Sequence, residues 1–189
     1  MKQIIKTSLI MFVILTVITG ILYPVAVWAA AKVLFPFQAE GSLVKKGTEV
    51  TGSVLIAQDF QKPEYFHPRP SAVSFDATNS GGSNIAASNP DLAKAVLDRA
   101  DKEKKMNPLN TGLIPMDMLT TSSSGLDPEI SIKAAQWQAK RVAAARGLDE
   151  KAVLEAVYKL KEGALLGFIG PDMVNVLKLN LYLDTVKAK

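Results

Sequence analysis

A glycine-rich stretch, Ser80-Gly81-Gly82-Ser83-Asn84, is the first candidate for chemistry in this chain. Consecutive backbone N–H groups in such a stretch can form a concave nest that binds an anion such as phosphate. The sequence lacks the GxxxxGKS/T pattern of nucleotide-binding loops, and no dinucleotide-binding fingerprint follows a strand. A plain tight turn explains the same residues, so phosphate binding is the alternative that needs a second observation.

Hydrolysis is the second candidate, because Ser122-Ser123-Ser124, Asp127 and the single histidine, His67, are the residue types of a catalytic triad. Asp127 is explained equally well as the N-cap of a helix that opens at Pro128, and no GxSxG elbow is present. We therefore expect no catalytic residue. The chain has no cysteine and one histidine, which excludes thiol chemistry and leaves no cluster of metal ligands.

An aromatic stretch that ends in an arginine is the third candidate. Tyr65, Phe66 and His67 precede Arg69 in a segment stiffened by prolines, and aromatic residues and arginine are enriched where proteins dock. The same rings could instead fill the core, with Arg69 paired to an acid inside the domain. The sequence leaves these two interpretations open.

The element that organises the rest of the chain is an uncharged, mostly apolar run from Thr7 to Ala31. As a helix it reaches about 38 Å, which exceeds the roughly 30 Å of a bilayer's hydrocarbon core. A cleavable signal peptide is the alternative, because Ala29-Ala30-Ala31 fits a cleavage site. Signal peptides usually have an apolar core of about 7 to 15 residues, so the length favours a transmembrane helix over 7–31.

The short segment before the helix predicts its orientation. Residues 1–6 carry Lys2 and Lys6 and no acid, so the positive-inside bias holds them in the cytoplasm. Residues 32–52 then form a connector that is polar from Gln38 to Gly52, and residues 53–189 form one extracytoplasmic domain. The remaining charges nearly balance and no basic run is interleaved with aromatics, which argues against nucleic-acid binding.

The domain mixes strand and helix patterns and is expected to be α+β. Ser53 to Ala57 reads as a buried strand, and 59–89 reads as an ordered loop of a length that is uncommon unless it serves a function or a partner. Further elements are expected as follows: a helix from Asn89 to about Lys105, an extended segment over 113–119, helices from Asp127 to Arg146 and from 149 to 161, and a last element over 174–184.

Two details of these elements are open or carry a specific expectation. Leucines alternate over 174–184, which is the period of a half-buried strand, although the spacing of Leu177 and Leu181 also suits a helix. In the first helix, Lys102, Lys104 and Lys105 alternate with Asp101 and Glu103, a pattern typical of a solvated face.

Taken in order, these stretches resemble the C subunits of the Kdp potassium-transporting ATPase, a bacterial membrane complex. The similarity spans nearly the whole chain. It rests on Gly52-Ser53, Gln58, Phe60, Tyr65-Phe66, Arg69-Pro70-Ser71-Ala72, Ser80 to Asn84, Thr121 to Ser131, Ala134-Ala135, Gln138, Arg141-Val142-Ala143, Ala145 to Leu148, Val174 to Leu177, Leu179-Asn180 and Leu183-Asp184.

The resemblance implies an accessory subunit in the bacterial inner membrane. Its partners would be a channel-like potassium-binding subunit, a P-type ATPase subunit, a small single-span subunit and the lipid bilayer. The chain has neither the DKTGT motif of the ATPase nor a TVGYG filter. We expect Tyr65, Phe66 and Arg69, with Val17 and Gly20 in the span, to contact partners.

A second role implied by the resemblance is that of a catalytic chaperone that raises the ATP affinity of the ATPase subunit. Ser80 to Ser83 would then contact nucleotide, with Gln58 and Gln138 against the base, and ATP would bind only together with the ATPase subunit. A domain outside the cell is far from cytoplasmic ATP, which favours assembly as the main role. A free-standing, membrane-anchored ligand-binding domain remains the alternative.

Overall fold

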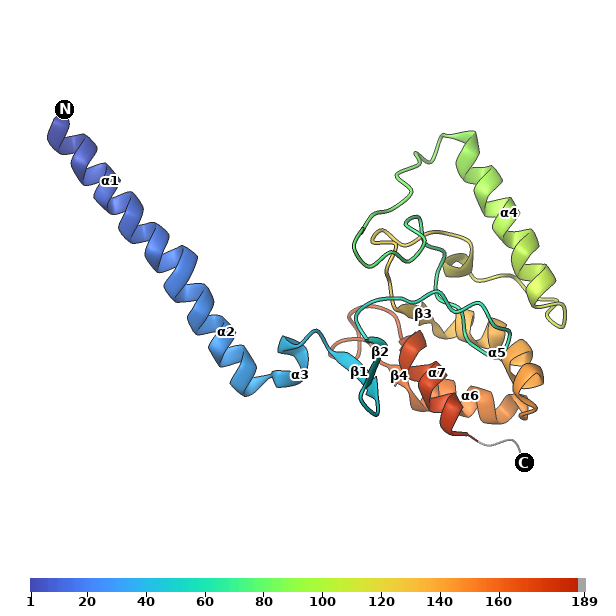
Figure 1. Cartoon of the computed structure of the whole chain (residues 1–189). Coiled ribbons are helices and arrows are strands. Elements are labelled where there is room, and N and C mark those ends of the chain that lie inside the picture. The colour runs from blue at the N-terminus through green and yellow to red at the C-terminus, as the bar shows by residue number, and fades with distance from the viewer. Residues whose placement is uncertain (187–189) are drawn as a thin grey trace. The chain divides into compact units, whose positions relative to one another are not determined.

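The computed structural model describes residues 1–186. The chain divides into two compact units, Met1–Thr51 and Gly52–Lys189, which are best followed by colour in Figure 1. The division lies one residue from the boundary expected between connector and domain. Each unit is described by itself.

A long apolar helix dominates the first unit. It consists of α1, Lys2–Val17, a π-helical turn, Ile18–Leu22, and α2, Tyr23–Leu34. The widened turn ends two residues before Pro24, which has no N–H to continue the regular ladder. Within residues 1–186, Lys2–Leu34 is the one helix long and apolar enough to cross a membrane by length and composition. It contains the predicted span.

The connector is more structured than expected. It holds α3, Pro36–Ala39, and a two-stranded sheet of β1, Leu43–Lys46, and β2, Glu49–Ser53. The buried strand predicted over Ser53 to Ala57 is wrong. The chain turns there, because the Ser53 hydroxyl accepts the N–H of Leu55 at 3.1 Å. Of the four apolar side chains over 54–57 only Ala57 is buried.

The second unit is an α+β domain built on a small antiparallel sheet of order β3-β5-β4. Its strands are β3, Glu129–Ser131, β4, Lys161–Glu162, and β5, Met173–Asn175, with Ile130 opposite Val174. Three helices supply most of the core: α5, Ile132–Arg146, α6, Glu150–Lys159, and α7, Val176–Thr185. This confirms the predicted fold class of one long apolar N-terminal helix followed by an α+β domain.

The helices α5 and α6 confirm the two helices expected up to Arg146 and from 149. Gly147 ends α5 in the left-handed conformation with φ +64°, which a glycine adopts without strain. Asp149 caps α6 by accepting the N–H of Lys151 at 3.0 Å. The start of α5 was predicted four residues too early, because Glu129–Ser131 pairs with β5 and Ser131 is the cap, accepting the N–H of Ala134.

The last element is a helix after a three-residue strand, so the strand predicted over 174–184 is wrong and its helical alternative holds. Asn175 ends the strand by accepting the N–H of Lys178 at 3.1 Å. The buried residues Val176, Leu179, Asn180 and Leu183 then follow the three- and four-residue spacing of a helix.

The loop over 59–89 contains no helix or strand, as expected, and leads into α4, Pro90–Met106. Asn89 caps this helix by accepting the N–H of Asp91 at 2.9 Å. Its apolar stripe is only partly covered, because Leu97 remains 66% exposed. The segment expected to be extended over 113–119 instead ends in a short 3-10 turn, Met116–Met118.

Candidate functional site

Two buried side-chain amides hold the centre of the aromatic stretch. The Asn180 amide donates to the carbonyl of Phe66 at 2.9 Å and accepts its N–H at 2.8 Å. The Gln138 amide makes the same pair of bonds to His67, at 3.0 and 2.8 Å. Each amide thus does what a neighbouring strand would do, and the loop is fixed without belonging to a sheet.

Arg141 extends this arrangement along the loop. Its guanidinium donates to the carbonyls of Pro63 and Tyr65, at 2.5 and 2.9 Å, and to the Gln138 amide oxygen at 2.8 Å. Its Nε donates to the Asn107 side chain at 3.1 Å. Burial lowers the pKa of Arg141 from its usual value, yet arginine stays charged in proteins. We call Asn180, Gln138, Arg141 and the residues 63–67 that they hold the loop clamp.

The predicted partner residues lie in or beside the loop clamp. Phe66 has no exposed surface and belongs to the core, so its side chain offers nothing to a partner in this conformation. Tyr65 is half-buried. Its ring stacks at an angle against Phe60, with centroids 5.3 Å apart, and lies 5.1 Å from the guanidinium carbon of Arg146.

Arg69 pairs with an acid of its own domain, one of the two interpretations that the sequence left open. Its Nη1 lies 3.1 Å from Asp127 Oδ2, and the two side chains are 24% and 26% exposed. Asp127 also accepts the N–H of Glu129 at 3.1 Å. The expected role of Asp127 as a helix cap is therefore wrong: it caps a turn before β3 and binds Arg69.

The glycine-rich stretch lies along the serine segment 121–125. Gly81 donates its N–H to the carbonyl of Ser124 at 2.8 Å, and the Ser80 hydroxyl donates to the same oxygen at 3.1 Å. A Cβ on Gly82 would stand 3.1 Å from the Ser123 carbonyl oxygen. Gly82 thus permits close backbone approach, and the Gly81 N–H already has an acceptor.

The residues expected to contact nucleotide do not line one cavity. Ser80 and Arg69 line an open cavity together with Ser123, Ser124 and Asp127. Gln58 lines a different one, where a Cβ on Gly52 would overlap its amide. Gln138 is fully buried with both ends of its amide bound to His67.

Val17 and Gly20, the predicted contacts in the span, belong to the first unit and are exposed on the long helix.

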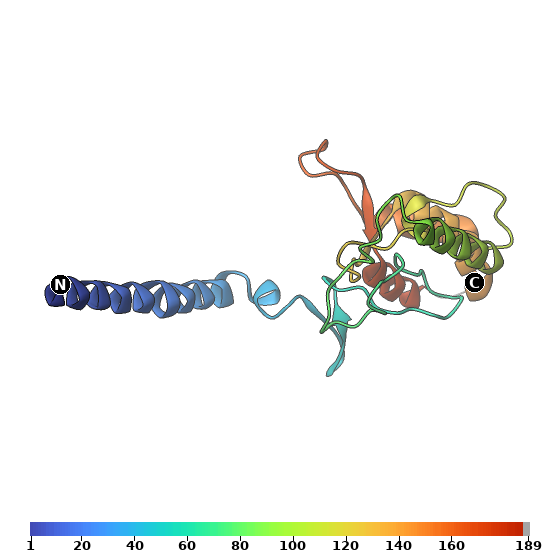
Figure 2. The ribbon, with the colours of Figure 1, turned by 90° about the horizontal axis from the view of Figure 1, so that it is seen from above.

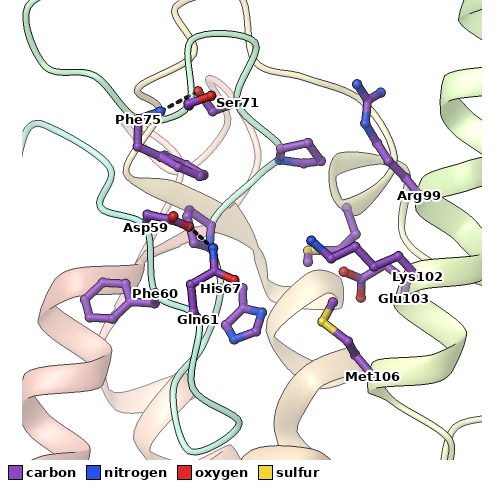
Figure 3. Close-up of a pocket in the computed structure, with 14 residues that line it drawn as sticks. Asp59, Phe60, Gln61, His67, Ser71, Phe75, Arg99, Lys102, Glu103 and Met106 are labelled. Atoms are coloured by element: carbon purple, nitrogen blue, oxygen red, sulfur yellow. Dashed lines mark hydrogen bonds between the residues drawn. The ribbon is translucent and has the colours of Figure 1, made fainter.

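A further cavity of about 330 Å³ lies between α4 and the loop over 59–75 (Figure 3). Helix α4 contributes Arg99, Lys102, Glu103 and Met106 to its wall, while the loop contributes acidic, aromatic and amide side chains. Arg99 also ties the helix to the domain by donating to the Leu119 carbonyl at 3.0 Å.

Glu103 is the site residue that sequence reasoning missed. The alternating charges of α4 predicted a solvated face, but Glu103 is only 6% exposed. Its Oε2 accepts the indole N–H of Trp137 at 3.2 Å and the Asn107 amide at 3.0 Å. Burial raises the pKa of Glu103 above its usual range. No local signal marks its burial, because Trp137 lies 34 residues away in the chain and only the tertiary fold brings it to Glu103.

His67 is the titratable group of this cavity whose pKa departs furthest from its usual value. Burial, followed by the nearby charge of Arg141, lowers the pKa of His67 from 6.5 to about 4. Its Nε2 lies 3.1 Å from the Lys62 carbonyl oxygen. The ring is therefore neutral in the folded protein at neutral pH.

This neutral histidine predicts a loss of stability in acid. Between the folded pKa near 4 and the unfolded pKa near 6.5, the unfolded chain binds more protons, so stability is complete above about pH 6.5 and falls toward pH 4. We expect His67 to contribute a loss of about 2 kcal/mol between pH 7.5 and 4.5. Urea unfolding at both pH values, compared with His67→Gln, measures it.

The variant isolates the histidine because it is the only one in the chain. Glu103 contributes the opposite slope, since a raised carboxyl pKa favours folding as the pH falls, and it does so in both proteins. Equal pH dependence of the two proteins would contradict the burial of a neutral ring.

Nearly the whole chain is similar to known proteins. The family described as K+-transporting ATPase, c chain, matches residues 5–185. The potassium-transporting ATPase KdpC subunit of Rhodospirillum rubrum is 48% identical over 186 residues, covering 97% of this chain and 96% of that protein. The KdpC subunit of Serratia proteamaculans is 49% identical over 185 residues, covering 96% and 98%. The chain therefore belongs to the KdpC family, the c chains of the K+-transporting ATPase.

Proposed function

We propose that this chain is a non-catalytic subunit that joins and stabilises the other subunits of a potassium-transporting ATPase in the membrane. The observation that carries the proposal is the long helix of the first unit. Neither α1 nor α2 has a buried residue, so the apolar surface of this helix needs lipid and other membrane helices to cover it. The family match supplies the identity of the complex.

The proposed orientation follows from charge. Lys2 and Lys6 with no acid favour a cytoplasmic N-terminus, which leaves the α+β domain outside the inner membrane of a bacterium. The partners proposed there are the channel-like potassium-binding subunit, the P-type ATPase subunit and the small single-span subunit. The loop clamp supports a docking role, because it holds the aromatic loop in one conformation before any partner binds.

A chaperone role that raises the ATP affinity of the ATPase subunit is a second proposal. The open cavity at Ser80 and Arg69 is the favoured place for a nucleotide contact. From outside the membrane, the effect would also need two conformations that both sites bias. Replacing Gly82 with alanine would push against the Ser123 carbonyl. An unchanged ATP dependence of the purified complex would remove this stretch from any nucleotide role.

Extraction of the chain from its native membrane in mild detergent, followed by mass spectrometry, tests the main proposal. A P-type ATPase and a channel-like protein in fixed ratio to this chain are the expected result. A chain recovered alone and folded would support the alternative of an independent ligand-binding domain. The intact mass decides the signal-peptide alternative, because cleavage after Ala31 would remove the first thirty-one residues.

The partner surface has its own test. We expect Tyr65→Ala combined with Arg69→Ala to lower the yield of complex several-fold, because both side chains expose part of their surface beside the fixed loop. Tyr158→Ala is the matched control, since that tyrosine is 52% exposed on α6. Unfolding of each variant is measured in parallel, and an unchanged yield in the double variant would reject this surface.

A further inference from the structure

The hairpin between β4 and β5 carries an exposed apolar tip. Figure 2 shows this hairpin extending away from the rest of the domain. Four large apolar side chains at its end are mostly open to solvent: Leu165 at 67%, Leu166 at 76%, Phe168 at 77% and Ile169 at 49%. Single exposed apolar residues are ordinary, but a contiguous group on a projecting loop marks an interaction site.

Five backbone N–H groups of the tip are hydrogen-bonded within the hairpin. Leu165 and Ile169 exchange N–H and carbonyl bonds, both of 2.9 Å. Gly167 donates to Ala164 at 2.9 Å, Phe168 donates to Leu165 at 3.3 Å, and the Ala164 N–H reaches the Asp172 carboxylate at 3.1 Å. An apolar medium demands this, because an unsatisfied N–H or carbonyl there is costly.

Charges are confined to the stem of the hairpin. Residues 163–171 carry none. Below them, Lys161 pairs with Asp172 at 2.7 Å and Lys178 pairs with Glu162 at 2.7 Å. The tip therefore ends in an uncharged surface, and the first ionised side chains after it are already paired. This is the gradient from polar to apolar that a membrane interface presents.

We propose that the tip, residues 163–171, inserts shallowly into the lipid bilayer in which the N-terminal helix is anchored. The chain itself keeps a bilayer within reach, since residues 35–51 between helix and domain span at most about 60 Å when fully extended. Lipid is favoured over a protein pocket because the tip has no polar side chain to set a register against a partner, whereas protein interfaces surround an apolar core with a polar rim.

The absence of native cysteine allows a direct test on the full chain. Leu166→Cys, labelled with an environment-sensitive fluorophore, is reconstituted into phosphatidylethanolamine and phosphatidylglycerol vesicles with and without lipids that carry a nitroxide near the headgroup. We expect these lipids to quench at least half of the emission, and aqueous iodide to quench little. Leu113→Cys is the matched control, being 97% exposed on the same domain, and should respond only to iodide.

Two further variants serve as controls for this measurement. Leu165→Cys combined with Leu166→Asp and Phe168→Asp should lose the lipid quenching, and because these side chains are exposed the domain should stay folded. Val13→Cys in the apolar helix reports anchoring independently, so failure of the anchor and failure of the tip are told apart.

The inference rests only on membrane anchoring, not on assembly of the complex. Iodide quenching of the Leu166 probe equal to that of the Leu113 probe would overturn it, because the tip would then lie in water. Shielding from iodide without quenching by the labelled lipids would also overturn it, by placing the tip against protein. The same measurement on the chain purified with its partners is expected to give the lipid result again.

Discussion

Replacing Arg141 with methionine is expected to lower the free energy of unfolding by about 3 kcal/mol, because four hydrogen-bond acceptors in and beside the loop lose a charged donor. The guanidinium bonds two loop carbonyls, the Gln138 oxygen and the Asn107 oxygen. Without it these acceptors are left partly buried with fewer donors, and the desolvation of each is no longer compensated.

Urea unfolding of the full chain in detergent measures this effect, with Trp137 as a probe inside the domain. Lys140→Met is the matched control, because Lys140 neighbours Arg141 on α5 but is exposed. Arg141→Lys should recover only part of the loss, since an ammonium cannot present the planar fork that reaches several acceptors. A loss below about 1 kcal/mol for the methionine variant would mean that the clamp does not hold the loop.

Local chemistry made several helix ends predictable from the sequence. Asn89 and Asp149 accept N–H groups only two residues ahead, and Gly147 ends α5 through its own backbone conformation. The apolar run of the long helix is equally local, because length and absence of charge suffice. Each of these features depends on neighbours within a few residues, which is what a sequence displays.

The wrong predictions concern residues whose conformation depends on contacts with residues far away in the sequence. Asp127 resembles a helix cap, but Arg69 and the pairing of β3 with β5 draw it into a turn. The alternating leucines of 174–184 suggested a strand, although the Asn175 cap and the packing of Asn180 on the loop make a helix. The alternation of leucines in the sequence carries no information about those contacts.

The loop clamp shows how much of the candidate site the sequence could indicate. Gln138 and Asn180 are polar residues at fully buried helix positions, and a polar residue in an apolar stripe signals a required partner. The sequence therefore offered a reason to single them out. It could not name Phe66 and His67 as the partners, because they lie 114 and 71 residues away in the chain.

Lysine at Val17 is expected to reduce the amount of assembled complex tenfold or more. Val17 and Gly20 lie one turn apart, near the middle of the 33-residue helix Lys2–Leu34, and we predict that this side meets partner helices. A charge at the centre of a span costs about 2.5 to 3.5 kcal/mol on insertion scales. At a helix–helix contact it cannot reach the headgroups as easily as a lipid-facing lysine does.

A pair of controls separates lost assembly from lost insertion. Leu15→Lys places the same charge at nearly the same depth but roughly 200° around the helix from residue 17, and Val17→Leu changes size without charge. Each variant is assayed for its share in the membrane fraction and for the ATPase subunit that co-purifies. The prediction requires all three chains to remain in the membrane while only Val17→Lys loses its partners. Equal losses for the two lysine variants would mean that depth in the bilayer matters and that the side of the helix does not.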